Sequence, residues 1–464
     1  MPTLSTPIRQ PKHKPMVEQP AASAPYHNLL QQPQDHLGSA RQFLQNQLRQ
    51  ASQQPCDLPG DPHQLNEWVK IGSARTTCAY RDYLNARKQG QPRRFFSSRA
   101  HALYFLRGVA PTKMVDGAWL YGVLAQWQDW RFHALVRTYI EELGDGEPLQ
   151  NHVALYKQLL NTHELNDTGT LSAGHYIQGA QQLALAHLAR EFLPELIGYN
   201  LGYEQLPLHL LITTYELNEL GIDPYYFQLH VTIDNADTGH AQKAAQAVLD
   251  NLPISGDPDA FYQRVKRGYL LNELGISSMD VIEGFNLEAE VHRILEQKAL
   301  VARNMHSDFC RIEGRTVNEW LNQPGRAGDF LAALEKRGWI QRDSDPAESR
   351  FWQLIQGNRA PMFGVFSVYE LQLLHDWIAG EWAAPHTPGQ PRRFVAPKMA
   401  AEPVDLGSFD AEQTALEQQL RKLPACDLMD ELIKLMSPSS HFTPAGLLAT
   451  RLFTQALGQP GIGH

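Results

Sequence analysis

The chain has 464 residues, and its 41 Lys and Arg against 50 Asp and Glu give a formal net charge of −9 at pH 7. This acidic balance, without a long basic run, lacks the electrostatic footprint of a nucleic-acid-binding protein. No apolar run approaches the roughly 20 residues of a transmembrane helix, and residues 1–20 lack the apolar core of a signal peptide. We therefore expect a cytoplasmic protein with no nucleic-acid partner and no membrane partner.

The cysteines are few and far apart, at positions 56, 78, 310 and 426. No two of them form a Cys-x-x-Cys pair, so neither a zinc ribbon nor a disulfide framework is indicated. This usage favours a reducing compartment, in agreement with a cytoplasmic location.

Apolar residues recur at helical spacing through most of the chain, and β-branched alternation is almost absent, so we expect an all-α fold. Pro, Gln, Ser and Ala dominate the start without any periodicity, which is typical of disorder. The expected divisions are a disordered arm over 1–35, an N-terminal helical segment over 36–94, a core over 95–303, a helical extension over 304–382, a Pro-rich linker over 383–408 and a small helical tail over 409–464.

Three expected helices define the layout of the core. The first covers residues 99–106 and is expected to be broken at Gly108 and Pro111, because proline disrupts a helix interior. A long amphipathic helix over 116–143 comes next, and the breaker run GDGEP stops it. Another covers residues 195–220, where Pro207 should kink or loosen the backbone.

The stretch YYFQLHVTIDNADTGHA, residues 225–241, is the point around which the core is organised. Asp223 can cap its start, and Pro224 suits a first helical turn. His230 and Asp234 are four residues apart and share a face with apolar residues, so this face is expected to be buried. A buried histidine and carboxylate are costly unless they are paired or bind a ligand.

Carboxylates and imidazoles recur on several segments of this core. They are Glu142, His152, Glu204, His230, Asp234, Asp237 and His240. Such side chains, projecting inward from facing helices, form the di-iron and di-manganese sites of helical bundles. Carboxylates neutralise and bridge two divalent cations, and imidazoles suit iron, so the pattern indicates a dinuclear metal site.

Three motifs carry a family resemblance: EELGDGEPLQNH over 141–152, GYNLGYE over 198–204 and YYFQLHVTIDNADTGH over 225–240. With the approach segment PTKMVDGAWLYGVL they make residues 95–300 resemble the heme-oxygenase-like diiron oxidases, also described as iron-containing redox enzymes. The resemblance implies a heme-oxygenase-like helical bundle, here with extra N-terminal helices and a helical C-terminal extension.

The resemblance also implies a set of metal ligands. These are Glu142, His152, Glu204, His230, Asp234 and His240. Asp237 is a rival to His240, because some relatives place the last histidine at that slot. On an ideal helix Asp237 lies within about 20° of His230, and His240 lies roughly 80° away. Ligation by His240 therefore requires a distorted helix, which Gly239 and its poorly helix-forming neighbours favour.

A nonheme diiron enzyme is the function that this resemblance implies. It would hold two Fe(II) ions, with manganese possible at one position, and use dioxygen as a co-substrate. Its substrate would be a small amino-acid-derived or fatty-acid-like molecule, undergoing N-oxygenation, desaturation or carbon–carbon cleavage. We expect the pocket within the bundle beside the metals, lined partly by Tyr121, Val123 and Leu124 of the approach helix, and the sequence leaves a homodimer open.

Two other functions stay open at this point. One is a metal-free or heme-handling enzyme of the same fold, in which the inward carboxylates perform acid–base chemistry. The other is a helical scaffold or binding protein, in which His230 and Asp234 form a structural pair one turn apart.

Overall fold

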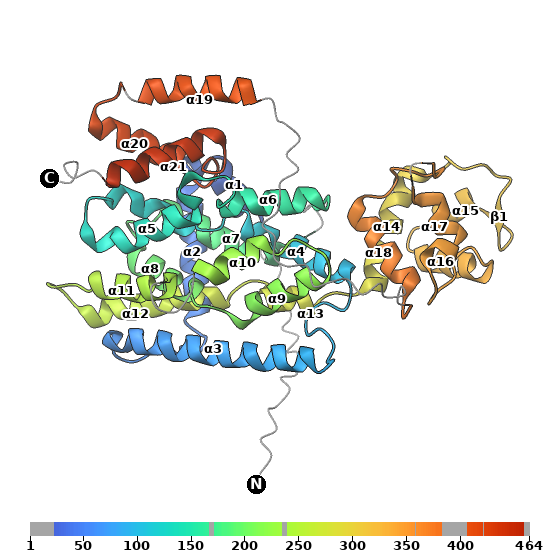
Figure 1. Ribbon diagram of the computed structural model, residues 1–464, viewed down its shortest axis with the longest axis horizontal. Helices are drawn as coiled ribbons and strands as arrows, with labels where there is room; N and C mark the ends of the chain where they lie inside the picture. Colours follow the sequence, from blue (N-terminus) through green and yellow to red (C-terminus); the bar gives the residue numbers. More distant parts are fainter. Residues whose placement is uncertain are drawn as a thin grey trace, which may run out of the picture.

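A computed structural model of the chain describes residues 23–166, 171–233, 239–357, 359–382, 406–420 and 422–458. The fold is all-α, as predicted (Figure 1). The only strands in these described ranges are β1 (Arg311–Ile312) and β2 (Arg315–Thr316), which pair as an antiparallel hairpin. No described helix is both long and apolar enough to cross a membrane.

The helices before residue 304 form an N-terminal group and a central bundle. In chain order they are α1 (Ser23–Gln31), η1 (Pro33–His36), α2 (Leu37–Ala51), η2 (Pro62–Gln64), α3 (Leu65–Lys88), α4 (Arg99–Lys113), η3 (Ala118–Gln126), η4 (Trp130–Phe132), α5 (His133–Glu142), η5 (Gly144–Gly146), α6 (His152–Thr162), η6 (Ala173–Tyr176), α7 (Ile177–His187), α8 (Leu193–Tyr203), α9 (Leu208–Glu219), α10 (Tyr225–Ile233), α11 (His240–Asp250), α12 (Pro258–Tyr269), η7 (Leu270–Glu273), α13 (Ser278–Glu283) and α14 (Leu287–Ala302), where η marks a 3₁₀-helix.

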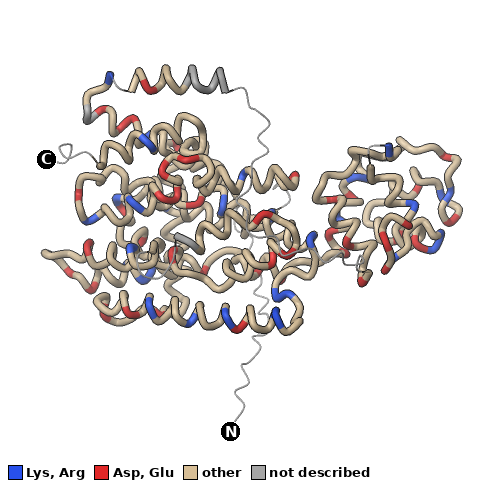
Figure 2. Tube along the Cα trace, viewed as in Figure 1, with Lys and Arg blue, Asp and Glu red and all other residues tan. Residues whose placement is uncertain are grey.

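The remaining helices form a C-terminal lobe and a tail. They are α15 (Val317–Leu321), α16 (Ala327–Lys336), η8 (Pro346–Glu348), α17 (Arg350–Ile355) and α18 (Val368–Ala379) in the lobe, then α19 (Leu406–Leu420), α20 (Ala425–Leu435) and α21 (Pro444–Leu457) in the tail. In Figure 1 the lobe lies beside the bundle, the tail covers the edge near α5, and α3 runs along the opposite edge. Acidic and basic residues are interspersed along α3 (Figure 2).

Helices α8 and α12 meet backbone to backbone in the centre of the bundle. A Cβ atom at Gly198 would lie 1.9 Å from the carbonyl oxygen of Val265. A Cβ atom at Gly268 would lie 1.9 Å from the carbonyl oxygen of Glu195. Only glycine fits at either position, and this close contact fixes α8, at whose C-terminal end Glu204 lies.

The part of the chain from α4 to α5 differs from the helices predicted there. Helix α4 continues through Pro111 to Lys113, because its residues are buried almost throughout and tertiary packing outweighs the local cost of proline. The single helix predicted over 116–143 was wrong. The chain there forms η3, η4 and α5, with Gly117 in the left-handed conformation at φ 78° before η3.

Two further differences concern proline and the N-terminus. Pro207 separates α8 from α9 completely, with extended backbone at the break, where the sequence predicted a kink or loosening in one helix. Residues 23–35, assigned to the disordered arm, form α1 and most of η1, and Tyr26 and Leu29 bury their side chains in the core. Residues 1–22 and most of the predicted linker lie outside the described residues.

The lobe and the tail both contact the bundle. In the lobe, the Asp376 carboxylate on α18 accepts a hydrogen bond of 2.8 Å from the backbone N–H of Ala100, at the start of α4. In the tail, the backbone carbonyl of Met436 accepts a hydrogen bond of 2.6 Å from the Tyr139 hydroxyl on α5. The start of α4 and helix α5 are therefore both held by residues far away in the sequence.

Candidate metal centre

Six buried side chains in the middle of the bundle form two groups of metal-ligand type. One group is Asp116, Glu142, His152 and His230, and the other is Glu142, Glu204 and His240. Within each group, the nitrogen and oxygen atoms that could bind a metal lie within 4.8 Å of one another. Glu142 belongs to both groups, so its carboxylate lies between them.

Glu142 and His152 are brought together by a tight return of the chain. Helix α5 ends at Glu142, and a Cβ atom at Gly144, where φ is 65°, would lie 2.4 Å from the backbone of Gln150. The side chain of Asn151 then caps α6, whose first residue is His152. As a result, Nδ1 of His152 donates a hydrogen bond of 2.5 Å to Oε2 of Glu142.

His230 lies on α10 and faces Asp116. Its Nδ1 donates to the backbone carbonyl of Tyr226 at 2.9 Å, which leaves Nε2 directed at the Asp116 carboxylate, 3.0 Å away. The same carboxylate accepts hydrogen bonds from the hydroxyl groups of Tyr203, at 2.7 Å, and Tyr226, at 2.5 Å. Burial alone would raise the pKa of Asp116, but Lys113 and His230 hold it well below its ordinary value.

His240, the first residue of α11, connects the second group to an outer carboxylate. Its Nδ1 lies 3.0 Å from Oε2 of Glu204, and its Nε2 donates to Oε2 of Glu141 at 2.7 Å. Lys243 in turn donates to Glu141 at 2.6 Å. Of the adjacent residues Glu141 and Glu142, only Glu142 therefore belongs to the metal-ligand groups. Glu141 lies outside them and orients the ring of His240.

The charges of the second group are strongly coupled. Burial alone would lower the pKa of His240, but the charge of Glu204 and the hydrogen bond to Glu141 outweigh it and raise the pKa to about 11. Burial raises the pKa of Glu204, and its contact with His240 only partly offsets this effect. Burial would likewise raise the pKa of Glu142, but His152 lowers it.

The structure brings five of the predicted ligands together: Glu142, His152, Glu204, His230 and His240. Asp234 and Asp237 lie outside the described residues. The described part of α10 ends at Ile233, and α11 begins at His240, after Gly239. His230 and His240 therefore lie on separate helices.

Asp116 was missed by the sequence analysis. It lies in the segment VDGAW, and the predicted helix placed it at its first residue, where an acidic side chain usually faces solvent. The available signal was a carboxylate beside a glycine inside an otherwise apolar run. Because no histidine or second carboxylate lies nearby in the sequence, only the fold shows its partners.

Two unpaired atoms test whether this cluster fits a metal. Among the described residues, Nε2 of His152 and Oε1 of Glu204 are buried and have no hydrogen-bond partner. Buried polar atoms are rarely left unpaired, and both residues belong to the groups of ligand type. Histidines that donate their second nitrogen to a carbonyl or a carboxylate, as His230 and His240 do, are also typical of metal centres. The donor set therefore fits metal binding.

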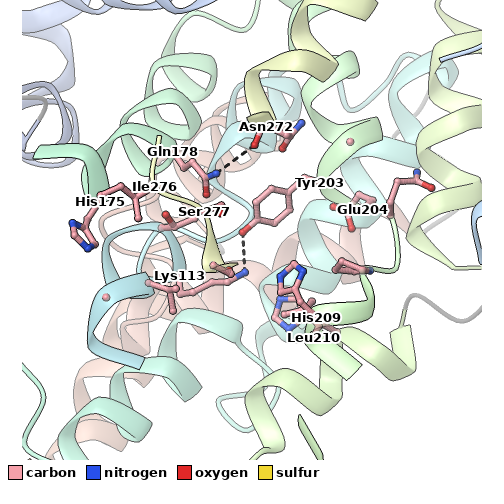
Figure 3. Close-up of a pocket in the computed structure, with 18 of the residues that line it drawn as sticks. Lys113, His175, Gln178, Tyr203, Glu204, His209, Leu210, Asn272, Ile276 and Ser277 are labelled. Atoms are coloured by element: carbon pink, nitrogen blue, oxygen red, sulfur yellow. Dashed lines mark hydrogen bonds between the residues drawn. The ribbon is translucent and has the colours of Figure 1, made fainter. Parts of the chain in front are cut away.

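A pocket of about 220 Å³ opens onto this cluster, and Figure 3 shows side chains that line it. Glu142, Glu204 and His230 lie at its inner end, and α4, η6, α7 and the start of α9 supply much of the remaining wall. The pocket lies beside the ligand groups, as predicted, but Tyr121, Val123 and Leu124 are not among the residues that line it. Those residues pack into the hydrophobic core, because η3 replaces the expected long helix.

The fold and the site together define a heme-oxygenase-like helical bundle with a buried carboxylate and histidine cluster. Residues 103–273, which carry all of the clustered side chains, match the family described as iron-containing redox enzymes. The match confirms the resemblance seen in the sequence. No curated protein and no solved structure matches the chain.

Proposed function

We propose that the protein is a nonheme diiron oxidase, which activates dioxygen to oxidise a small organic substrate. The observation that carries this proposal is the pair of buried ligand groups that share Glu142, with a pocket that opens directly onto them. Dinuclear sites of this kind are built inside helical bundles from inward carboxylates and histidines.

The proposed ligands divide between two ions. Asp116, Glu142, His152 and His230 would hold one, and Glu142, Glu204 and His240 would hold the other. Asp234 stays a proposed ligand, with Asp237 as the rival to His240. Two Fe(II) ions bound there, or one Fe(II) and one manganese ion, would supply the electrons that reduce dioxygen.

The outer contacts of His230 and His240 determine which ring nitrogen of each would face the metal ions. The carbonyl of Tyr226 keeps the proton of His230 on Nδ1, so Nε2 faces the cluster. Glu141 keeps the proton of His240 on Nε2, so Nδ1 faces Glu204. Such contacts orient the ring and increase the basicity of the ligating nitrogen.

Enclosure is the second contribution of the chain. Asp116 and Glu142 are almost fully buried, and Tyr203 and Tyr226 cover the Asp116 carboxylate with their hydroxyl groups. Tyr203 also lines the pocket, which reaches the cluster at Glu142, Glu204 and His230. Asp116 is thereby shielded from water, and access to the cluster is through the pocket. This arrangement confines oxidation to a substrate that fills the pocket.

Dioxygen consumption by Glu204→Ala tests the proposal. After anaerobic loading with Fe(II), wild type should consume dioxygen, and the variant should have lost this activity while keeping its helical circular-dichroism signal. Glu219→Ala, at an exposed position near the end of α9 where Glu219 pairs with Arg87, is the matched control and should keep its dioxygen consumption. Undiminished consumption by Glu204→Ala would show that the site is assigned wrongly.

A further inference from the structure

The wall of the pocket beyond the metal ligands contains one lysine, Lys113, at the C-terminal end of α4 (Figure 3). We propose that Lys113 is an anion-binding subsite for the carboxylate of a small substrate, and that metal binding at Asp116 makes it available. This inference rests on the proposed function, because it assumes a metal beside Asp116. It assigns a substrate class and a specificity residue to that site.

Lys113 is held in place and nevertheless has binding capacity left. Its side chain is 10% exposed, and its ammonium group donates a hydrogen bond of 3.0 Å to the Tyr203 hydroxyl. Its nearest carboxylate oxygen, on Asp116, is 3.9 Å away, which is longer than a hydrogen bond. An ammonium group has three donors, so a substrate anion could accept from those that Tyr203 leaves.

Asp116 couples the lysine to the metal. Without a metal, its carboxylate compensates the charge of Lys113, although it also accepts from Tyr203, Tyr226 and His230. A divalent cation bound by the same carboxylate would neutralise this negative charge. Lys113 would then be a nearly buried cation without a counter-ion, which is unfavourable until another anion binds.

The rest of the wall favours an anion as well. Among the described residues that line the pocket, the only carboxylates are Glu142 and Glu204, and both belong to the metal-ligand groups. Burial, and then the charge of Lys113, lower the pKa of His209 to about 4, so this histidine is neutral at pH 7. The neutral polar side chains that complete the wall include Gln178, Asn272 and Ser277.

The volume of the pocket limits the size of the substrate. The pocket encloses about 220 Å³, and a cavity of about 150 Å³ is known to hold a benzene molecule, so the enclosed part of the substrate has on the order of ten non-hydrogen atoms. A small carboxylate of amino-acid size fits this space. The polar wall provides hydrogen-bond partners for a second polar group on the substrate.

Paired probes test the subsite by calorimetry on the full-length chain loaded anaerobically with Fe(II). The probes are butyrate, benzoate and L-leucine, each compared with its carboxamide, so that only the charge differs. Wild type should bind at least one carboxylate at least tenfold more tightly than its amide, as expected for a hydrogen bond between charged groups. Iron-free wild type should show at least fivefold less of this preference, since Asp116 then compensates Lys113.

Variants distinguish the contribution of Lys113 to the carboxylate preference from that of the bound metal. Lys113→Met should reduce the preference to within about threefold, as expected when a charged hydrogen-bond partner is lost. Lys113→Arg should retain a clear preference, and Lys266→Met, on α12 outside the pocket, should match wild type. Iron content is measured on each sample. Full iron without a carboxylate preference in wild type, or a preference that survives Lys113→Met, overturns the subsite alone. A wild type that retains no iron overturns the proposed function and this inference together.

Discussion

Adjacent glutamates at the end of α5 have different roles at the residue scale. Glu142 belongs to both ligand groups, whereas Glu141 contacts Nε2 of His240 from outside. Glu142→Gln should therefore remove most of the bound iron, because one change affects both positions. Glu141→Gln should keep both ions but weaken iron binding by about 10- to 100-fold, the effect typical of an outer partner. Equal iron loss in both variants, measured by anaerobic iron titration, would contradict this division.

Proton release is a second consequence of residue-scale electrostatics. The pKa of His240 is raised to about 11, so the iron-free site holds an imidazolium at pH 7. A histidine ligand must be neutral, so metal binding expels this proton, and iron affinity should rise with pH as long as the pH is below 11. Calorimetry in two buffers of different ionisation enthalpy should show release of at least one proton. His240→Gln should release fewer, and an affinity that falls between pH 6 and pH 8 would refute the assignment.

At the element scale, the contact between α8 and α12 holds Glu204 in place. Gly198→Ala places a methyl group 1.9 Å from a backbone oxygen, so the helices must move apart. Overpacking of this kind costs about 1–3 kcal/mol or more of unfolding free energy. Gly72→Ala, in α3 where nothing lies within 4 Å of the added atom, should instead stabilise the protein by up to about 1 kcal/mol. Chemical denaturation of both variants measures the difference, and a Gly198→Ala as stable as wild type would contradict the packing argument.

Element-scale prediction from the sequence succeeded where a local rule dominates. Helical periodicity indicated the all-α fold. Pro207 was expected to disturb the backbone close to Glu204, and it does so, although it separates two helices instead of kinking one. Prediction failed at Pro111, where a buried environment outweighs the cost of proline in α4. It also failed after Asp116, because apolar spacing alone does not distinguish one long helix from successive 3₁₀ turns.

At the scale of the whole molecule, the tail supports the metal centre. His441, between α20 and α21, is buried with Nδ1 3.1 Å from the side-chain nitrogen of Asn151, and Asn151 caps the helix that begins with His152. His441→Ala should lower iron affinity by about tenfold, as expected for an outer contact. His441→Asn, which keeps a hydrogen-bonding group, is the matched control and should lose less. Iron titration measures these affinities, and an unchanged iron affinity in His441→Ala would contradict a supporting role of the tail.

Long-range contacts explain what the sequence did not reveal of the site. The motifs around Glu142, Glu204 and His230 identified most of the clustered side chains, because histidines and carboxylates on a buried helix face have few other roles. Asp116 and His441 have no such local pattern. Their roles depend on contacts across 114 and 290 positions, which only the folded chain reveals.

The sharing of Glu142 by two iron ions is the feature on which the proposed function depends. Mössbauer spectroscopy tests this sharing directly. Wild type and Glu142→Ala are loaded anaerobically with Fe(II), exposed to dioxygen and measured in parallel. We expect about two irons per chain, magnetically coupled after oxidation, and loss of this coupling in the variant. Iron that is mononuclear in wild type, or coupling that persists without Glu142, would show that the two ligand groups do not form one dinuclear site.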